Sequence, residues 1–247
     1  MKNTRACHEQ QHFDVLATWY ETPLGQKVAA QVKDQLTQHF SNFFGYHSVQ
    51  LGLPNMPHWL HTVPISHTTV MQPWPDEQLD LQSQFHRLPF ADNSLDFMLL
   101  PHTLEHCAHP GALLDEVSRV LIPHGRAVFV GFNLYSLWGV KRYFHCLRSA
   151  QWGGRWHSPL SLNALLADHS LATEHVDTFF YRPPLANARS LERLYFLEKL
   201  GQLAWPYPGG LYCCVAKKYA MRITPTRQIW RIKDYVIGKV GVQVEAE

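Results

Sequence analysis

The chain has 247 residues, of which 46% are hydrophobic, enough for one large or two small domains with a buried core. Its net charge of +2 is too small to indicate nucleic-acid binding by itself, so we expect no nucleic-acid partner. Residues 1–13 contain no apolar leader, and no run of about 18 apolar residues occurs in the sequence. We therefore expect a cytoplasmic protein without a transmembrane segment.

Residues 1–45 are expected to form an N-terminal helical extension. Thr22 and Pro23 are typical of a helix start, and apolar residues then recur every four positions as far as Phe40. The periodicity predicts an amphipathic helix that ends by Gly45 and turns one face toward the core.

Residues 46–219 alternate between short apolar runs and helical patterns. This rhythm predicts an α/β domain with a Rossmann-like, doubly wound and mostly parallel sheet. Residues 220–247 are expected to be a basic C-terminal tail. The expected strands are 47–53, 65–71, 79–85, 95–100, 126–132, 172–180 and 210–219, and the expected helices are 110–120, 158–168 and 189–203.

His102, Glu105 and His106 have the spacing of the inverzincin zinc-binding pattern. In that pattern two histidines on a sustained helix bind zinc and the glutamate acts as a base. Here the segment follows a strand directly and reaches Pro110 after barely one turn, too short to present both imidazoles firmly. We therefore expect no metal site. The five cysteines lack C-x-x-C spacing, so neither a disulfide framework nor a zinc knuckle is indicated.

Residues 84–133 carry a more specific resemblance. The run contains an LPF-x-D-x-S-x-D stretch before an apolar strand, then Leu-Glu-His, and later a Glu-x-x-Arg-Val-Leu-x-Pro helix end. It resembles the central block of the class I S-adenosylmethionine-dependent methyltransferases, in the type 11 domain branch. The matching residues are Leu88, Pro89, Phe90, Asp92, Ser94, Asp96, Leu104, Glu105, His106, Glu116, Arg119, Val120, Leu121, Pro123, Gly125 and Asn133.

The resemblance implies a seven-stranded sheet with a reversed last strand and S-adenosylmethionine as cofactor at the carboxyl ends of the strands. Open α/β sheets bind ligands at that edge, where the strand order reverses. The implied cofactor-binding residues are Gln50, Gly52, Leu53, Met71, Gln84, Phe85, Leu100, Pro101 and His102. No catalytic residue is assigned, although His102 is the nearest candidate for a base, with a structural role as its alternative.

The sequence departs from the family at the first glycine-rich loop. Gln50 replaces the usual acid, and Pro54 and Met56 replace two glycines, so only Gly52 remains. Acidic residues are also missing at Gln72 and Gln84. Because hydrogen bonds to charged groups are stronger than neutral ones, these changes would weaken cofactor binding by on the order of 3–5 kcal/mol. The alternative function is therefore a non-catalytic relic of the fold that acts as an interaction module.

The segment 133–148 corresponds to the cover of the acceptor pocket in the family. Its apolar residues are Leu134, Leu137, Trp138, Phe144 and Leu147, and they lie beside Lys141, Arg142 and Arg148. One interpretation is an ordinary lid helix with a solvated basic edge. The other is a site for a small-molecule, apolar or lipid-like acceptor, or a weak peripheral contact with an anionic membrane surface. The sequence indicates neither the methylated atom nor the oligomeric state.

Overall fold

The structure is a computed structural model, and it describes residues 2–145, 153–183 and 209–219. Its centre is a seven-stranded sheet with the order β3-β2-β1-β4-β5-β7-β6. β1 to β5 are parallel to one another, and β7 is antiparallel to β5 and β6. The predicted mostly parallel α/β sheet with a reversed last strand is confirmed. The strands are β1 (Gly45–Leu51), β2 (Ile65–Gln72), β3 (Leu81–Gln82), β4 (Leu95–Pro101), β5 (Leu121–Phe132), β6 (Leu171–Phe179) and β7 (Leu211–Lys218).

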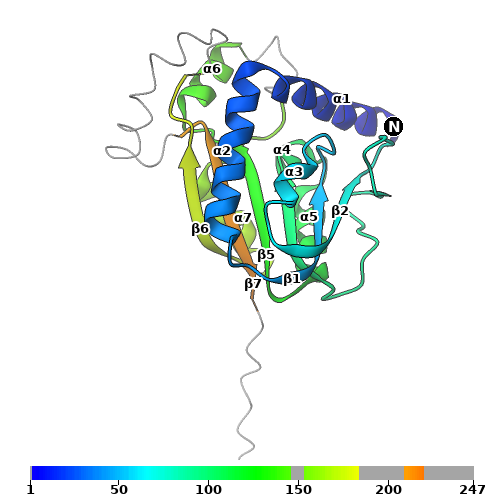
Figure 1. The fold of residues 1–247 in the computed structure, drawn as a ribbon. Coiled ribbons are helices and arrows are strands. Elements are labelled where there is room, and N and C mark those ends of the chain that lie inside the picture. The colour runs from blue at the N-terminus through cyan, green and yellow to red at the C-terminus, as the bar shows by residue number, and fades with distance from the viewer. Residues whose placement is uncertain (1, 146–152, 184–208, 220–247) are drawn as a thin grey trace, which may run out of the picture.

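Helices cover both faces of the sheet and one of its ends. Figure 1 shows α2 on one face, α5 and α7 on the other, and α1 above the carboxyl ends of the parallel strands. The helices are α1 (Lys2–Tyr20), α2 (Pro23–Phe40), α3 (Pro57–Leu60), α4 (Thr103–His106), α5 (Pro110–Val120), α6 (Leu137–His145) and α7 (Pro159–Ala167).

The helix starts follow local sequence chemistry. The Thr22 side chain accepts a hydrogen bond from the backbone N–H of Gly25 at 3.1 Å and so caps α2, as predicted. Ser158 and Ser161 form a reciprocal capping box at the start of α7, within the predicted helix 158–168. In both helices a proline occupies the first turn, where its missing N–H leaves no bond unmade.

The structure differs from the prediction in residues 1–45, in β3 and at the start of β5, which begins at Leu121 and not at the predicted residue 126. The prediction for residues 1–45 contains one helix, whereas the structure has both α1 and α2. The predicted strand 79–85 is wrong in length, because only Leu81 and Gln82 pair with β2. The Asp80 carboxylate and the backbone N–H of Ser83 instead bind the main chain of β2, and the chain turns away at Gln84.

Two predicted segments lie outside the described residues. These are the helix 189–203 and the basic tail 220–247. The division of the chain at residues 45 and 219 therefore stays a prediction. Within the described ranges, none of the helices is both long enough and apolar enough to cross a bilayer.

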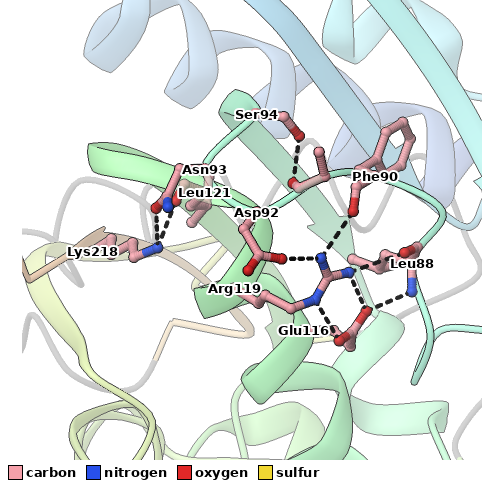
Figure 2. A network of polar contacts seen from close by, with 10 residues as sticks. Leu88, Phe90, Asp92, Asn93, Ser94, Glu116, Arg119, Leu121 and Lys218 are labelled. Carbon is pink, nitrogen blue, oxygen red and sulfur yellow. Dashed lines mark hydrogen bonds and ion pairs between the residues drawn. The ribbon is translucent and has the colours of Figure 1, made fainter.

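Arg119 of α5 holds the loop that precedes β4 (Figure 2). Its guanidinium donates to the backbone oxygens of Leu88 and Phe90 at 3.0 and 2.9 Å. It also binds the carboxylates of Glu116 and Asp92. Glu116 in turn accepts from the backbone N–H of Leu88 at 2.7 Å. The LPF-x-D stretch and the Glu-x-x-Arg of the resemblance are thus the two halves of one structural network.

We expect this network to make stability depend on pH. The hydrogen bond from Arg119 is the main cause that lowers the pKa of Glu116 below its ordinary value. A carboxyl with a lowered folded-state pKa stabilises the fold above its unfolded pKa, and that contribution is lost as the pH falls through the folded-state pKa. Urea unfolding between pH 7 and pH 3 should therefore show a steeper loss for the natural chain than for Glu116→Gln. Equal slopes for the two proteins would contradict this assignment.

Candidate functional site

The strand order reverses between β1 and β4, which are adjacent in the sheet although β2 and β3 separate them in sequence. Chains that leave such a pair diverge to opposite faces and open a crevice at the carboxyl edge. The two strand ends are joined directly, because the Thr103 hydroxyl donates to the backbone oxygen of Leu51. The residues expected to bind a cofactor lie around this edge.

A tight turn follows β1. Gly52 and Leu53 both have left-handed backbone angles, with φ of 85° and 49°. Such a turn is costly at Leu53, since a side chain disfavours positive φ. The Gln50 side chain supports the turn by donating from Nε2 to the backbone oxygens of Gly52 and Leu53 at 3.1 and 2.8 Å. Its Oε1 atom is buried and has no hydrogen-bond partner among the described residues.

Side chains of α1 fill the crevice. The Phe13 ring packs against Trp74 and Phe85, with ring centroids 5.1 and 5.9 Å apart. It also lies so close to Gly52 that a Cβ atom there would be 2.6 Å from the Phe13 ring. The space left beside Phe13 is a cavity of about 50 Å³. Its lining residues are Phe13, Asp14, Ala17, Leu53, Pro54, Asn55, Gln72, Trp74 and Asp76.

The remaining expected cofactor residues are distributed unevenly around this cavity. Phe85 forms part of the aromatic contact with Phe13, and Gln84 beside it is exposed. Met71, Leu100 and Pro101 are buried at the ends of their strands. The structure therefore brings the expected residues to one edge of the sheet but covers most of them.

A buried polar chain lies at the end of β4. His102 is fully buried, and its backbone φ of 56° is left-handed. Its Nε2 atom is 2.7 Å from the Tyr20 hydroxyl, and its Nδ1 atom is 3.0 Å from Glu105 Oε2. Glu105 Oε1 accepts from the backbone N–H of Phe132. These contacts join α1, β4, α4 and β5 at one point.

The geometry around His106 differs from the inverzincin pattern. α4 is one turn long and begins only after His102, while Glu105 is bound to His102. His106 stacks on His12 of α1 at a centroid distance of 5.1 Å, and neither of its ring nitrogens has a hydrogen-bond partner in the described part. Burial, followed by the nearby charges of His102 and His12, lowers the pKa of His106 to about 3. No group of three or more metal-ligating side chains occurs within the described ranges.

The segment after β5 only partly matches the expected cover of an acceptor pocket. Trp138 is fully buried and belongs to the core, which corrects its assignment to an apolar acceptor surface. Arg142 is not a solvated cation, because it donates to the backbone oxygen of Gly154 at 2.6 Å. Leu134 and Leu137 are 41% and 51% exposed. Phe144 is a position whose side chain the structure does not describe, and Leu147 and Arg148 lie outside the described residues.

Sequence reasoning missed three residues of the site. Phe13 and Tyr20 were left out because no helix was predicted there. Yet Phe13, Leu16, Ala17 and Tyr20 have the spacing of one helical face, and that signal was available. Asp76 was missed because it lies beyond the expected end of β2, after the Pro-Trp-Pro turn. It supplies a carboxylate beside Gln72, where none was expected.

Comparison with known proteins agrees with the observed fold. Residues 59–129 match the family profile described as a methyltransferase domain. This segment of the chain is therefore similar to a methyltransferase domain. It is 33% identical over 132 residues to the uncharacterised protein YafS of Escherichia coli, which covers 53% of this chain and 54% of YafS. The chain spans about half the length of the curated relatives it matches.

Solved structures show the same fold. A methyltransferase from Thermotoga maritima, described as SAM-dependent and a possible histamine N-methyltransferase, aligns with a TM-score of 0.60 at 14% identity. The alignment covers 84% of this chain and 99% of that protein. Geranyl diphosphate C-methyltransferase from Streptomyces coelicolor, solved with Mg²⁺, geranyl diphosphate and S-adenosyl-L-homocysteine, aligns with a TM-score of 0.52 at 13% identity. That alignment covers 79% and 80% of the two chains.

The implied cofactor, S-adenosylmethionine, fits the crevice walls that the sheet and its following turns supply. It does not fit the space that α1 leaves between those walls. The left-handed turn at Gly52 lets the backbone approach a ligand closely, and the buried Gln50 Oε1 atom, which has no partner among the described residues, can accept a hydrogen bond from it. Pockets for ligands of this size usually measure about 300–1,000 Å³. A cavity of about 50 Å³ is therefore too small, and Phe13 would have to move.

Proposed function

We propose that the chain transfers a methyl group from S-adenosylmethionine to an acceptor, and that α1 leaves the crevice to admit the cofactor. The observation that supports the proposal most directly is that the aromatic side chains that fill the crevice come from a single helix. Phe13 and Tyr20 both come from α1, a helix outside the sheet, whereas the sheet supplies the turn at Gly52 and the end of β4. Displacement of one peripheral helix would open the crevice without disturbing the sheet.

The residues that would hold the cofactor follow from the crevice walls. The turn at Gly52 and Leu53 would offer backbone groups, and Asp76 and Gln72 would offer oxygen atoms to a ribose. Phe85 and Trp74 would supply apolar contact once Phe13 had left them. The cofactor would bring an electrophilic methyl group, and the protein would contribute alignment and exclusion of water.

The acceptor class proposed from the sequence is a small-molecule, apolar or lipid-like compound. The exposed Leu134, just before α6, and Leu137, its first residue, support an apolar acceptor. The non-catalytic interaction module is the alternative, and the observation that favours it is the closed crevice itself. A fold that no longer binds the cofactor would gain stability by burying Phe13 permanently.

Calorimetric titration with S-adenosylhomocysteine distinguishes the two. We expect saturable binding together with faster hydrogen exchange of the backbone amides in residues 9–20, because the ligand binds only the open form. Binding without any change in those amides would contradict the movement of α1. Absence of heat and of any thermal shift at millimolar ligand, also after Phe13→Ala, would favour the interaction module.

A further inference from the structure

Three buried groups form a chain that ends at the crevice. Glu105, His102 and the Tyr20 hydroxyl follow one another at hydrogen-bond distances of 3.0 and 2.7 Å. Glu105 lies in α4 and His102 directly precedes that helix, whereas Tyr20 lies in α1. The first two groups therefore remain in place when α1 moves, and the third does not.

The hydrogen-bond pattern defines which nitrogen of His102 carries the proton. Glu105 accepts from the backbone N–H of Phe132 and faces His102 Nδ1 with its other oxygen. A carboxylate only accepts, so Nδ1 carries the hydrogen and Nε2 has a free lone pair. Burial, reinforced by the negative charge of Glu105, raises the pKa of Tyr20 well above its ordinary value. Tyr20 therefore keeps its proton, and its hydroxyl donates a hydrogen bond to Nε2.

The position of His102 at the end of β4 suggests a catalytic role for this chain of groups. His102 follows β4 at the point where β1 and β4 diverge, which is where a ligand of the sheet crevice lies. Building on the methyltransferase function proposed above, we propose that His102 is the general base of the site, that Glu105 positions it, and that the acceptor carries an aromatic hydroxyl whose place Tyr20 occupies when α1 is closed.

The surroundings of Tyr20 support this acceptor class. The Tyr20 ring meets Trp59 of α3 edge to face at a centroid distance of 5.2 Å. Phe132 of β5 lies 4.5 Å from the His102 ring. Neither Trp59 nor Phe132 belongs to α1, so both would still line the place after α1 had moved. An apolar ring with one hydroxyl directed at Nε2 matches those walls.

The chemical step is balanced with the sulfonium donor as the only co-reactant. The acceptor oxygen forms a bond to the methyl carbon while the bond from that carbon to sulfur breaks, and the electron pair of the broken bond stays on sulfur. The proton of the hydroxyl passes to His102 Nε2. The resulting imidazolium faces the Glu105 carboxylate, which stabilises its charge.

Other buried titratable groups lie close to this pair. Burial raises the pKa values of Tyr20 and Tyr212 and lowers the pKa values of His106 and His157. The charge of Glu105 acts on Tyr20, Tyr212 and His157, so His157 is a second histidine near that carboxylate.

The test removes the tyrosine side chain and returns it as a free molecule. Tyr20→Gly leaves a space of the shape of 4-methylphenol beside His102. With S-adenosylmethionine present, we expect this variant to convert 4-methylphenol into 4-methylanisole, detected by mass spectrometry. The natural chain should convert it far more slowly, because Tyr20 competes for the same place.

Glu105→Gln then tests the positioning role without changing shape. The amide oxygen stays with the Phe132 N–H, so the amide nitrogen donates to His102 Nδ1 and moves the ring proton to Nε2. In the Tyr20→Gly background we expect methylation of 4-methylphenol to fall on the order of 10³–10⁴-fold, as for other bases held in the wrong tautomer. His157→Gln, which changes another histidine close to Glu105, should leave the rate unchanged.

A second readout is independent of activity. Nitrogen NMR of the histidine rings, assigned through His102→Gln, should show hydrogen on Nδ1 of His102 in the natural chain and on Nε2 in Glu105→Gln. A ring that carries its hydrogen on Nε2 in the natural chain would overturn the proposal, even if Tyr20→Gly failed to fold. Methylation that is insensitive to Glu105→Gln or to His102→Gln would also overturn it, as would absence of methylation in a variant that binds both ligands. Failure of every variant to bind S-adenosylhomocysteine would instead reject the underlying methyltransferase function.

Discussion

Phe13→Ala is expected to strengthen the binding of S-adenosylhomocysteine on the order of ten- to a hundredfold. Phe13 is 2% exposed in the closed form and contacts Trp74, Phe85 and His106. Truncation of a buried phenylalanine costs about 3–5 kcal/mol, and here most of that cost falls on the closed form alone. Since the apparent dissociation constant varies inversely with the open fraction, a larger open fraction increases the apparent affinity. Calorimetry on both proteins measures the change directly.

Phe40→Ala is the matched control for this prediction. Phe40 is 1% exposed, lies on α2 and packs against Phe43 and Phe97, away from the crevice. It should cost similar global stability and leave the affinity for S-adenosylhomocysteine unchanged. Equal affinity changes in the two variants would show that loosening of the whole fold, and not opening of the crevice, controls binding. Weaker binding in Phe13→Ala than in the natural chain would mean that Phe13 belongs to the bound form.

The sequence predicted most strands of the sheet well because each of them is marked by the composition of its own residues. The nearly all-apolar run of β4 and the antiparallel β7 each matched the structure, since burial on both faces leaves a direct mark on composition. The predicted length of β3 was too great, because apolar and polar residues alternate beyond the two residues that pair with β2. On either side of that pair, the Asp80 carboxylate and the Ser83 N–H bind the main chain of β2 outside the regular strand pairing. Pairing of such a short edge strand depends on partners distant in sequence, which local pattern does not contain.

The sequence predicted which residues lie at the carboxyl edge of the sheet, but it did not predict that the crevice between them is filled. The order of strands places Gln50, Gly52 and His102 near one another. Nothing in that order indicates that Phe13, 39 positions before Gly52, fills the crevice between them. Because Phe13 lies against Gly52, a substitution at Gly52 would have two effects. A larger side chain there would be strained at positive φ and would collide with Phe13, so it would alter the closure of α1 as well as the cofactor turn.

Arg119→Ala is expected to lower the free energy of unfolding by about 2–4 kcal/mol. The side chain is 32% exposed and is shared between two carboxylates and two backbone oxygens of the loop before β4. Its removal leaves Glu116 without its cation and frees the Leu88 and Phe90 carbonyls. Urea unfolding followed by circular dichroism measures the loss.

Arg126→Ala separates this role from an ordinary ion pair. Arg126 is 30% exposed and forms a two-point contact with Glu174 at 2.7 and 3.1 Å, and both of these hydrogen bonds end on carboxylate oxygens, not on the backbone. Surface pairs of that kind contribute about 0–1 kcal/mol, so Arg126→Ala should cost much less than Arg119→Ala. Arg119→Lys should behave like Arg119→Ala, because an ammonium keeps the charge but cannot reach carboxylates and carbonyls as a planar fork does. Full stability in Arg119→Lys would mean that charge alone holds the loop, and that its anchoring through backbone oxygens is energetically unimportant.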